Sequence, residues 1–295
     1  MNLNLQRKRA LVTGSSAGIG AEIARVLVEE GASVIVHGRN AERANKLAAD
    51  LRAGGGAVAV TLGDLTNDNE VQRVAHEAER AFGGVDILVN NAGGYPITSW
   101  WNTPAEVWLE TYNTDVVAGV RLVKALVPGM IERGWGRVIQ IASRAATAGT
   151  ANFFPQYASA KAAQLRIASS LAVELARTGV TSNAISPGAV ATDTFKSLYT
   201  ERARKEGRST EWADVERWWI DQFMPGVAVA RLLTAREIAE MTAFLASPCA
   251  DAITGSDFVV DGGLGVTGFN RQPSQAPKSS AQSDAGRSQS ASMAG

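Results

Sequence analysis

The sequence predicts an α/β fold, a doubly wound parallel sheet of seven strands with helices on both faces. Seven short apolar runs rich in β-branched residues recur along the chain, and segments of helical periodicity separate them. The runs are unbroken rather than alternating, as is typical of strands covered on both faces. Right-handed crossovers between such strands place helices on both sides of one sheet.

The predicted elements follow one another along the chain in a regular order. The predicted strands are Arg9–Thr13, Ser33–His37, Ala57–Leu62, Val85–Asn90, Arg137–Ala142, Val180–Ser186 and Ser256–Asp261. The helical candidates between them include Ile19–Glu30, Ala41–Arg52, Asp68–Phe82 and Ala158–Arg177. Because no linker divides the chain before residue 270, we expect a single domain over residues 1–269.

Two segments depart from the strand–helix alternation. Residues 194–229 form a long insertion of mixed charge that contains several tryptophans, and we expect a helical lid there. Residues 270–295 are rich in Ser, Gln, Ala and Gly, with Met293 as the one large apolar residue. Such a segment cannot bury enough surface to offset its ordering entropy, so we expect a disordered tail.

Composition argues against several classes of protein. In 295 residues, 29 Lys and Arg balance 29 Asp and Glu, so no net field favours nucleic acid or an anionic membrane. The single cysteine, Cys249, excludes an internal disulfide and suits a reducing cytoplasm. The histidines His37 and His76 lie far apart without metal-ligand spacing, so we expect no metal. No apolar run is long enough for a signal peptide or a membrane span, so we expect a cytoplasmic protein.

A glycine-rich turn follows the first predicted strand. Thr13–Gly20 reads TGSSAGIG and leads into an apolar-periodic helix. Its three glycines let the backbone turn sharply and approach a pyrophosphate, and the helix N-terminus offers free N–H donors. The sequence therefore predicts a dinucleotide site in a Rossmann-like fold. The expected contacts in this turn are Gly14, Ser15, Ser16, Gly18, Ile19 and Gly20.

The end of the second predicted strand indicates which dinucleotide binds. Gly38 stands where an NAD site places a carboxylate, and Arg39 follows it. A guanidinium can bind a 2′-phosphate through charge-assisted hydrogen bonds. We therefore expect NADP(H), with Ser15 and Asn40 as additional polar contacts. The alternative is that Arg39 is only a solvated loop residue.

Several ordered motifs resemble those of the short-chain dehydrogenase/reductase family, over about Leu5 to Val266. They are TGxxxGxG in the glycine turn, NNAG at Asn90–Gly93 and YASAK at Tyr157–Lys161, with further likeness in GDLT, SPGAVATD and GSDFVVDGG. The resemblance implies hydride transfer between a nicotinamide and a carbonyl or alcohol carbon. It also implies cofactor contacts at Asp64, Leu65, Asn91, Ala92, Gly93, Tyr157, Lys161, Pro187, Gly188, Val190 and Thr192.

The resemblance assigns three residues to the chemistry. A ketone that receives a hydride needs a proton on its oxygen, and Tyr157 matches the family's acid. A phenol, with a reference pKa of about 10, is too weak an acid unless a nearby cation favours the phenolate. Lys161, one helical turn along, supplies that cation. Ser143 follows the fifth strand and would orient the carbonyl and stabilise the developing oxyanion.

One position departs from the family pattern. The family carries an asparagine in the helix after the fourth strand, and counting back thirteen residues from Pro128, which should end that helix, gives Asp115. In the family this residue helps to hold a water linked to the lysine, partly through its main-chain carbonyl. An aspartate keeps that carbonyl. We therefore expect the proton relay to survive, with a carboxylate that favours the ammonium form of Lys161.

Aromatic residues gather in the segments that the resemblance assigns to the substrate. They are Tyr95, Trp100, Trp101, Phe153, Phe154, Trp212, Trp218, Trp219 and Phe223. They predict either a pocket for a bulky apolar or aromatic ketone, or the core of the lid and a subunit interface. The lid also carries cations that could dock an acyl carrier or coenzyme A, or simply form a solvated helix. These cations are Arg202, Arg204, Lys205 and Arg208.

The leading expectation is an NADPH-dependent ketone reductase. One alternative is a 3-oxoacyl-thioester reductase, and another is a non-catalytic cofactor-sensing protein, since a fold alone does not guarantee a function. By analogy with the family we expect a homotetramer. It would assemble through the long helices after the fourth and fifth strands and through the C-terminal strand region.

Overall fold

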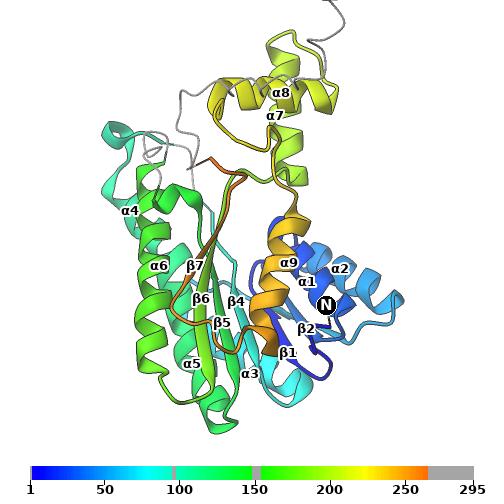
Figure 1. The fold of residues 1–295 in the computed structure, drawn as a ribbon, viewed down its shortest axis with the longest axis vertical. Helices are drawn as coiled ribbons and strands as arrows, with labels where there is room; N and C mark the ends of the chain where they lie inside the picture. The colour runs from blue at the N-terminus through cyan, green and yellow to red at the C-terminus, as the bar shows by residue number, and fades with distance from the viewer. Residues whose placement is uncertain (1, 95–97, 148–153, 265–295) are drawn as a thin grey trace, which may run out of the picture.

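A computed structural model describes residues 2–94, 98–147 and 154–264 of the chain (Figure 1). Within these residues, seven parallel strands form one sheet in the order β3-β2-β1-β4-β5-β6-β7, which confirms the predicted fold class. The strands are β1 (Arg9–Val12), β2 (Ser33–Gly38), β3 (Val58–Leu62), β4 (Ile87–Asn90), β5 (Gly136–Ile141), β6 (Val180–Pro187) and β7 (Asp257–Val260).

Helices cover both faces of this sheet (Figure 1). One apolar core lies under α1 (Gly18–Glu29), α2 (Ala41–Ala53) and α9 (Ala235–Ala246). The second lies under α3 (Asp68–Phe82), α5 (Ala118–Glu132) and α6 (Pro155–Glu174). The inner strands β1, β2, β4, β5 and β6 are buried on both sides, which explains their apolar runs, whereas the edge strands β3 and β7 are partly exposed.

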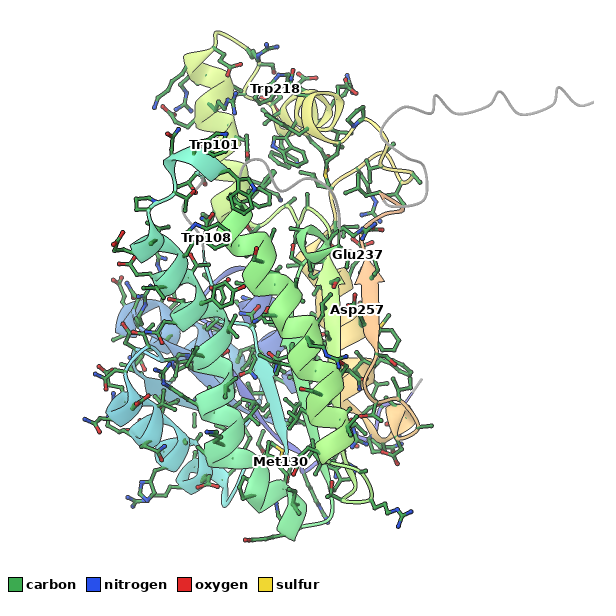
Figure 2. All side chains as sticks on the ribbon, turned by 90° about the vertical axis from the view of Figure 1, so that its left-hand side faces the viewer. Trp101, Trp108, Met130, Trp218, Glu237 and Asp257 are labelled. Carbon is green, nitrogen blue, oxygen red and sulfur yellow. The ribbon has the colours of Figure 1, made fainter. Side chains whose placement is uncertain are left out.

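The remaining helical segments lie toward the carboxyl ends of the strands. They are η1 (Trp100–Asn102), α4 (Ala105–Tyr112), the π-helical turn η2 (Asn113–Val117), η3 (Arg144–Ala146), α7 (Asp193–Lys205) and α8 (Trp212–Phe223). The short turn η5 (Pro248–Ala250) instead precedes β7 and lies near the start of β5, where Arg137 donates to the carbonyl of Ser247. Because all strands are parallel, the segments that follow them meet at one edge of the sheet, where α/β folds bind ligands. Figure 2 shows Trp101 and Trp218 at this end of the molecule and Met130 at the other.

The expected lid segment consists mainly of the two helices α7 and α8, which extend beyond the sheet (Figure 1). Their facing sides form an aromatic cluster. The ring centroids of Phe195 and Trp219 lie 5.1 Å apart, and those of Trp219 and Phe223 lie 5.3 Å apart. The side chains of Trp219 and Ile220 are buried in this cluster. The aromatic residues of α8 therefore hold this unit together.

Two helix boundaries differ from expectation. Helix α5 does not end at Pro128 but continues through it to Glu132. A proline removes only its own N–H from the helical ladder, and Met130 in the last turn is fully buried beneath the sheet. Helix α6 begins at Pro155, three residues before the predicted start, because a proline at the first helical position is already set to helical φ.

Candidate active site

The glycine turn after β1 leaves no room for a side chain at Gly14 or Gly20. Gly14 has φ +63°, and a Cβ there would lie 2.9 Å from the Cα of Ala92. At Gly20 a Cβ would lie 2.4 Å from Asn91 Nδ2. Helix α1 begins after Ala17, which gives it no side-chain cap among the described residues. A close backbone and an uncapped helix N-terminus fit the pyrophosphate of a dinucleotide.

Asn91 and Thr13 fix this turn against β4. The Asn91 side-chain amide donates to the carbonyl oxygens of Thr13 at 2.9 Å and Gly14 at 3.3 Å. The Thr13 hydroxyl accepts from the N–H groups of Asn91 and Ala92, each at 2.9 Å. Asn91 therefore also holds the glycine turn in its conformation, in addition to its expected place in the cofactor cleft.

His37, the penultimate residue of β2, supports the same turn from beneath. The N–H of Gly14 donates to His37 Nδ1 at 3.2 Å, and His37 Nε2 lies 3.2 Å from the carbonyl oxygen of Gly63. This pair of contacts requires the neutral ring with its proton on Nε2. Burial lowers the pKa of His37 to about 4, so the ring is neutral at pH 7.

The end of β2 contains the residues expected to distinguish NADP from NAD. Arg39 is exposed, with its guanidinium 3.9 Å from the carboxylate of Asp64. A Cβ at Gly38 would lie 2.8 Å from Ser16 Oγ, so the hydroxyl of Ser16 lies at this corner. The Thr66 N–H and hydroxyl, and to a lesser degree the Arg39 guanidinium, lower the pKa of Asp64.

The other two polar contacts expected here are already bonded to protein. Ser15 is fully buried, and its hydroxyl donates to the carbonyl of Val12 at 2.7 Å and accepts from the His37 N–H at 2.9 Å. Asn40 caps α2 by accepting from the N–H of Arg43 at 2.9 Å. The hydroxyl of Ser16, rather than that of Ser15, therefore lies beside Gly38 at the end of β2.

The remaining expected cofactor residues lie around the same edge. A Cβ at Gly18 would contact the Thr192 methyl group at 3.6 Å, so the loop after β6 faces the glycine turn. Leu65 and Val190 are buried core residues, with 6% and 8% of their surface exposed. Ile19, Ala92, Gly93 and Gly188 lie in the segments that follow β1, β4 and β6, and Pro187 is the last residue of β6.

Lys161 is buried under the catalytic end of α6. Its Nζ donates to the main-chain carbonyl of Ile141 at 2.8 Å and to Gln164 Oε1 at 2.9 Å. The same atom lies 5.4 Å from the ring centroid of Tyr157. Burial lowers the pKa of Lys161, and the carboxylate of Asp115 opposes that shift. The structure thus brings the predicted Tyr–Lys pair together.

Asp115 lies in the π-helical turn η2, and its carboxylate is buried. Its Oδ1 accepts from the N–H of Gly94 at 3.0 Å, while Oδ2 lies 4.0 Å from Lys161 Nζ and has no hydrogen-bond partner among the described residues. Burial raises the pKa of Asp115, and Lys161 opposes this. Its main-chain carbonyl, the expected link of the relay, accepts from Gln164 Nε2 at 2.6 Å.

Ser143 is the N-cap of the short helix η3, which packs against α6. Its hydroxyl oxygen accepts from the N–H of Ala145 at 3.1 Å, which orients the side chain at the end of β5. On the other side of the tyrosine, the rings of Phe154 and Tyr157 meet edge to face with centroids 5.7 Å apart. The loop after β4 joins this region through Thr98, whose hydroxyl donates to Gln156 Oε1 at 3.2 Å.

The expected substrate residues separate into two groups. Trp100 and Trp101, on η1, are 58% and 96% exposed. Trp212, Trp218, Trp219 and Phe223 belong to the cluster between α7 and α8, so they form the core of this two-helix unit. Tyr95 and Phe153 lie outside the described residues.

The four lid cations are all paired with glutamates of the same segment. Arg202 and Arg208 both contact Glu206 at 2.9 Å, and Arg204 and Lys205 both pair with Glu201. Such local pairing is typical of a solvated helix surface.

Two residues of the site were not identified from sequence. His37 was considered only as a metal ligand, although a histidine at the end of a buried strand needs polar partners. Gln164 follows Lys161 by three residues, and both are buried on the face of α6 that also carries Ala168. A polar residue at an inward-facing position of the predicted helix is the sequence feature that could have identified Gln164.

A dinucleotide-binding turn beside a Tyr–Lys pair at one sheet edge defines the class, a nucleotide-dependent oxidoreductase. The chain belongs to the short-chain dehydrogenase family, whose sequence model matches residues 8–203. It is therefore an oxidoreductase of alcohol and ketone groups that uses a nicotinamide cofactor. Among the described residues, no helix is long and apolar enough to cross a bilayer. Within the same residues, no group of three or more His, Cys, Asp or Glu side chains could hold a metal ion.

Three similar proteins illustrate the range of this family. The 3-oxoacyl-[acyl-carrier-protein] reductase of Vibrio cholerae is 37% identical over 262 residues, 89% of this chain and 99% of the relative. The L-sorbose reductase of Gluconobacter frateurii, complexed with NADPH and L-sorbose, has TM-score 0.83 at 31% identity and covers 90% of this chain and 98% of its own. A 7α-hydroxysteroid dehydrogenase, complexed with NADH and 7-oxo glycochenodeoxycholic acid, has a TM-score of 0.78 at 32% identity. The match covers 91% of this chain and 98% of the dehydrogenase chain.

Proposed function

We propose that this protein is an NADPH-dependent reductase of bulky apolar or aromatic ketones, with Tyr157 as the proton donor. The observation that carries the proposal is the buried Lys161 ammonium 5.4 Å from the Tyr157 ring centroid. When bound, the nicotinamide supplies the hydride. Tyr157 donates the proton that the substrate oxygen then needs, and Lys161 stabilises the phenolate that remains.

Ser143 is the proposed carbonyl-orienting residue. It lies two residues after β5 and caps η3, and the packing of η3 against α6, the helix that carries Tyr157, supports this role. A hydroxyl that donates to the substrate oxygen stabilises negative charge as it develops. In the alcohol-oxidising direction the same residues act in reverse, with the Tyr157 phenolate accepting the proton.

The proposed preference for NADPH rests on Arg39. Its exposed guanidinium, paired with Asp64 only at 3.9 Å, can bind a 2′-phosphate, and the hydroxyl of Ser16 lies beside Gly38 at the same corner. The L-sorbose reductase neighbour binds NADPH, whereas the hydroxysteroid dehydrogenase neighbour binds NADH.

The proposed substrate class rests on exposed aromatic rings. Trp100 and Trp101 lie on η1, and Thr98 links their loop to the start of α6. Phe154 packs against the tyrosine itself. Trp101→Ala should raise the KM of an aryl ketone several-fold relative to that of a small aliphatic ketone. Equal effects on both would contradict the proposed selectivity.

A ketone panel tests the activity. Wild type, Tyr157→Phe and the control Tyr112→Phe, in α4, are followed by NADPH absorbance. We expect Tyr157→Phe to lose at least about 10²-fold in kcat, the contribution of a positioned acid, while Tyr112→Phe keeps the wild-type rate. Background rates in all three would support a non-catalytic cofactor-sensing protein instead.

Arg39→Asp tests the cofactor preference. We expect the ratio of kcat/KM with NADPH to that with NADH to fall by about tenfold or more, because a carboxylate repels the 2′-phosphate. Arg43→Asp, one helical turn along the exposed start of α2, is the matched control. An unchanged ratio in Arg39→Asp would mean that the guanidinium is only solvated.

A 3-oxoacyl-thioester reductase is the second candidate. The 37% identity with the Vibrio cholerae reductase favours this candidate. The four cations Arg202, Arg204, Lys205 and Arg208 give it no further support, because each is already paired with a glutamate. Activity on an acetoacetyl thioester that is lost in Arg204→Glu would favour this candidate over a general ketone reductase.

We also infer a homotetramer. The elements expected at its interfaces carry exposed apolar residues, namely Ile131 on α5, Val173 on α6 and Val259 on β7, at 41%, 78% and 49% exposure. Light scattering should give the mass of four chains, and Val173→Glu should lower it. A wild-type monomer would refute this assignment.

A further inference from the structure

Gln164 connects the two buried charged groups of the site. Its Oε1 accepts from Lys161 Nζ at 2.9 Å, and its Nε2 donates to the main-chain carbonyl of Asp115 at 2.6 Å. The side chain is 2% exposed. It therefore spans from α6 to the π-helical turn η2 without solvent.

An amide is the side chain that these two partners require. An ammonium has only donors, and a peptide carbonyl has only acceptors. An aliphatic residue would remove one hydrogen bond from each group, and a carboxylate would set its second oxygen against the carbonyl. The identity of these partners also fixes the orientation of the amide, with its oxygen toward Lys161.

We propose that Gln164 is a positioning residue of the candidate site, which holds the Lys161 ammonium in place and joins it to the main chain at Asp115. The ammonium has three protons. One goes to Ile141 and one to Gln164, which leaves the third for the side of the Asp115 carboxylate at 4.0 Å. Gln164 thus fixes the ammonium at its position 5.4 Å from the Tyr157 ring centroid. This inference rests on the proposed function, in which Lys161 supports Tyr157.

The charges around Lys161 make it sensitive to this contact. Burial lowers the pKa of Lys161, and Asp115 is the carboxylate that opposes the shift. On the other elements that pack against α6, Arg144 pairs with a carboxylate near β7, while Glu106 and Glu110 on α4 are exposed. Removing the Gln164 acceptor should therefore weaken the ammonium form, and with it the Tyr157 phenolate.

The test compares wild type with Gln164→Met, which nearly keeps the volume and removes both contacts. Thr242→Val is the control. Thr242 is fully buried in α9 and donates to Ile238 of the same helix, so the change removes a buried polar group away from the site. Two readouts are taken, the pH dependence of kcat for alcohol oxidation with NADP⁺ and the phenolate absorbance of each protein minus that of its Tyr157→Phe form.

We expect Gln164→Met to lower kcat at neutral pH by about tenfold or more, as loss of a hydrogen bond to a charged group implies. Both the acidic limb of the rate profile and the phenolate midpoint should move to higher pH, with Thr242→Val unchanged. If Gln164→Met does not fold, Gln164→Asn replaces it, because its shorter amide cannot reach both partners. Its rate profile and phenolate midpoint should also move to higher pH.

Lower thermal stability with wild-type midpoints would make Gln164 a merely structural residue and would overturn the inference. If wild type and Tyr157→Phe show the same background rates on every substrate, the proposed function fails instead. The absorbance titration then still decides the role of Gln164, because it requires no turnover.

Discussion

Replacing His37 should remove a large part of the pH dependence of folding stability. The ring is 3% exposed and holds the glycine turn through Gly14 and the end of β3 through Gly63. Protonation would place a second N–H where Nδ1 now accepts a hydrogen bond. The folded protein therefore resists protonation of this ring, which is why its pKa falls from 6.5 to about 4.

The magnitude follows from linkage. Below pH 6.5 the unfolded chain binds a proton on His37 that the folded chain does not bind until about pH 4. The free energy of unfolding must therefore decrease as the pH falls through this window. At about 1.4 kcal/mol per pKa unit, the full loss is about 3 kcal/mol, of which about 2 kcal/mol is reached by pH 5.

The assay is urea unfolding at pH 7.5 and pH 5.0, at one protein concentration, for wild type and His37→Gln. A glutamine offers an acceptor and a donor without binding a proton, so the variant should lose about 2 kcal/mol less than wild type between these pH values. His76→Gln, at an exposed position on α3, is the control. Equal losses in wild type and His37→Gln would refute the reasoning.

Three further predictions follow from the packing. Gly20→Ala would place a methyl carbon 2.4 Å from Asn91 Nδ2. The affinity for NADPH, measured by fluorescence titration, should therefore fall about tenfold. An unchanged Kd would contradict the close packing of this turn. Ser143→Ala should lower kcat about 10²-fold with unchanged cofactor affinity, which steady-state rates and the same titration can check. Trp219→Ala should destabilise the α7–α8 unit by about 3–5 kcal/mol, whereas Trp101→Ala should barely change thermal melting.

Much of the fold follows from local pattern. Each predicted strand overlaps an observed one, and the ends differ by at most two residues, as for β4, which begins at Ile87 rather than Val85. Unbroken apolar runs identify such strands because burial on both faces tolerates no polar alternation. The helix boundary at Pro128 was wrong because burial of Met130 holds a turn beyond it, and a tertiary contact does not appear in a local pattern.

The candidate site also combines features that the sequence predicts with features that only the structure shows. Helical spacing was enough to place Tyr157 and Lys161 on one face of α6. Which serine hydroxyl lies beside Gly38 could not be predicted, because Ser15 and Ser16 are neighbours and only the turn geometry buries Ser15. The role of the lid tryptophans was also open, since aromatic residues form pockets and cores alike, and here Trp219 packs into the core.

The sequence by itself determined the strand–helix order, the glycine turn and the spacing of the Tyr–Lys pair, because each depends on neighbours within a few residues. The tertiary structure decided what surrounds that pair. Asp115 is 46 positions before Lys161 in the chain, yet it meets the lysine and Gln164 in one buried unit. Hydrogen bonds between residues so far apart in sequence depend on how η2 packs against α6, and no local periodicity encodes that packing.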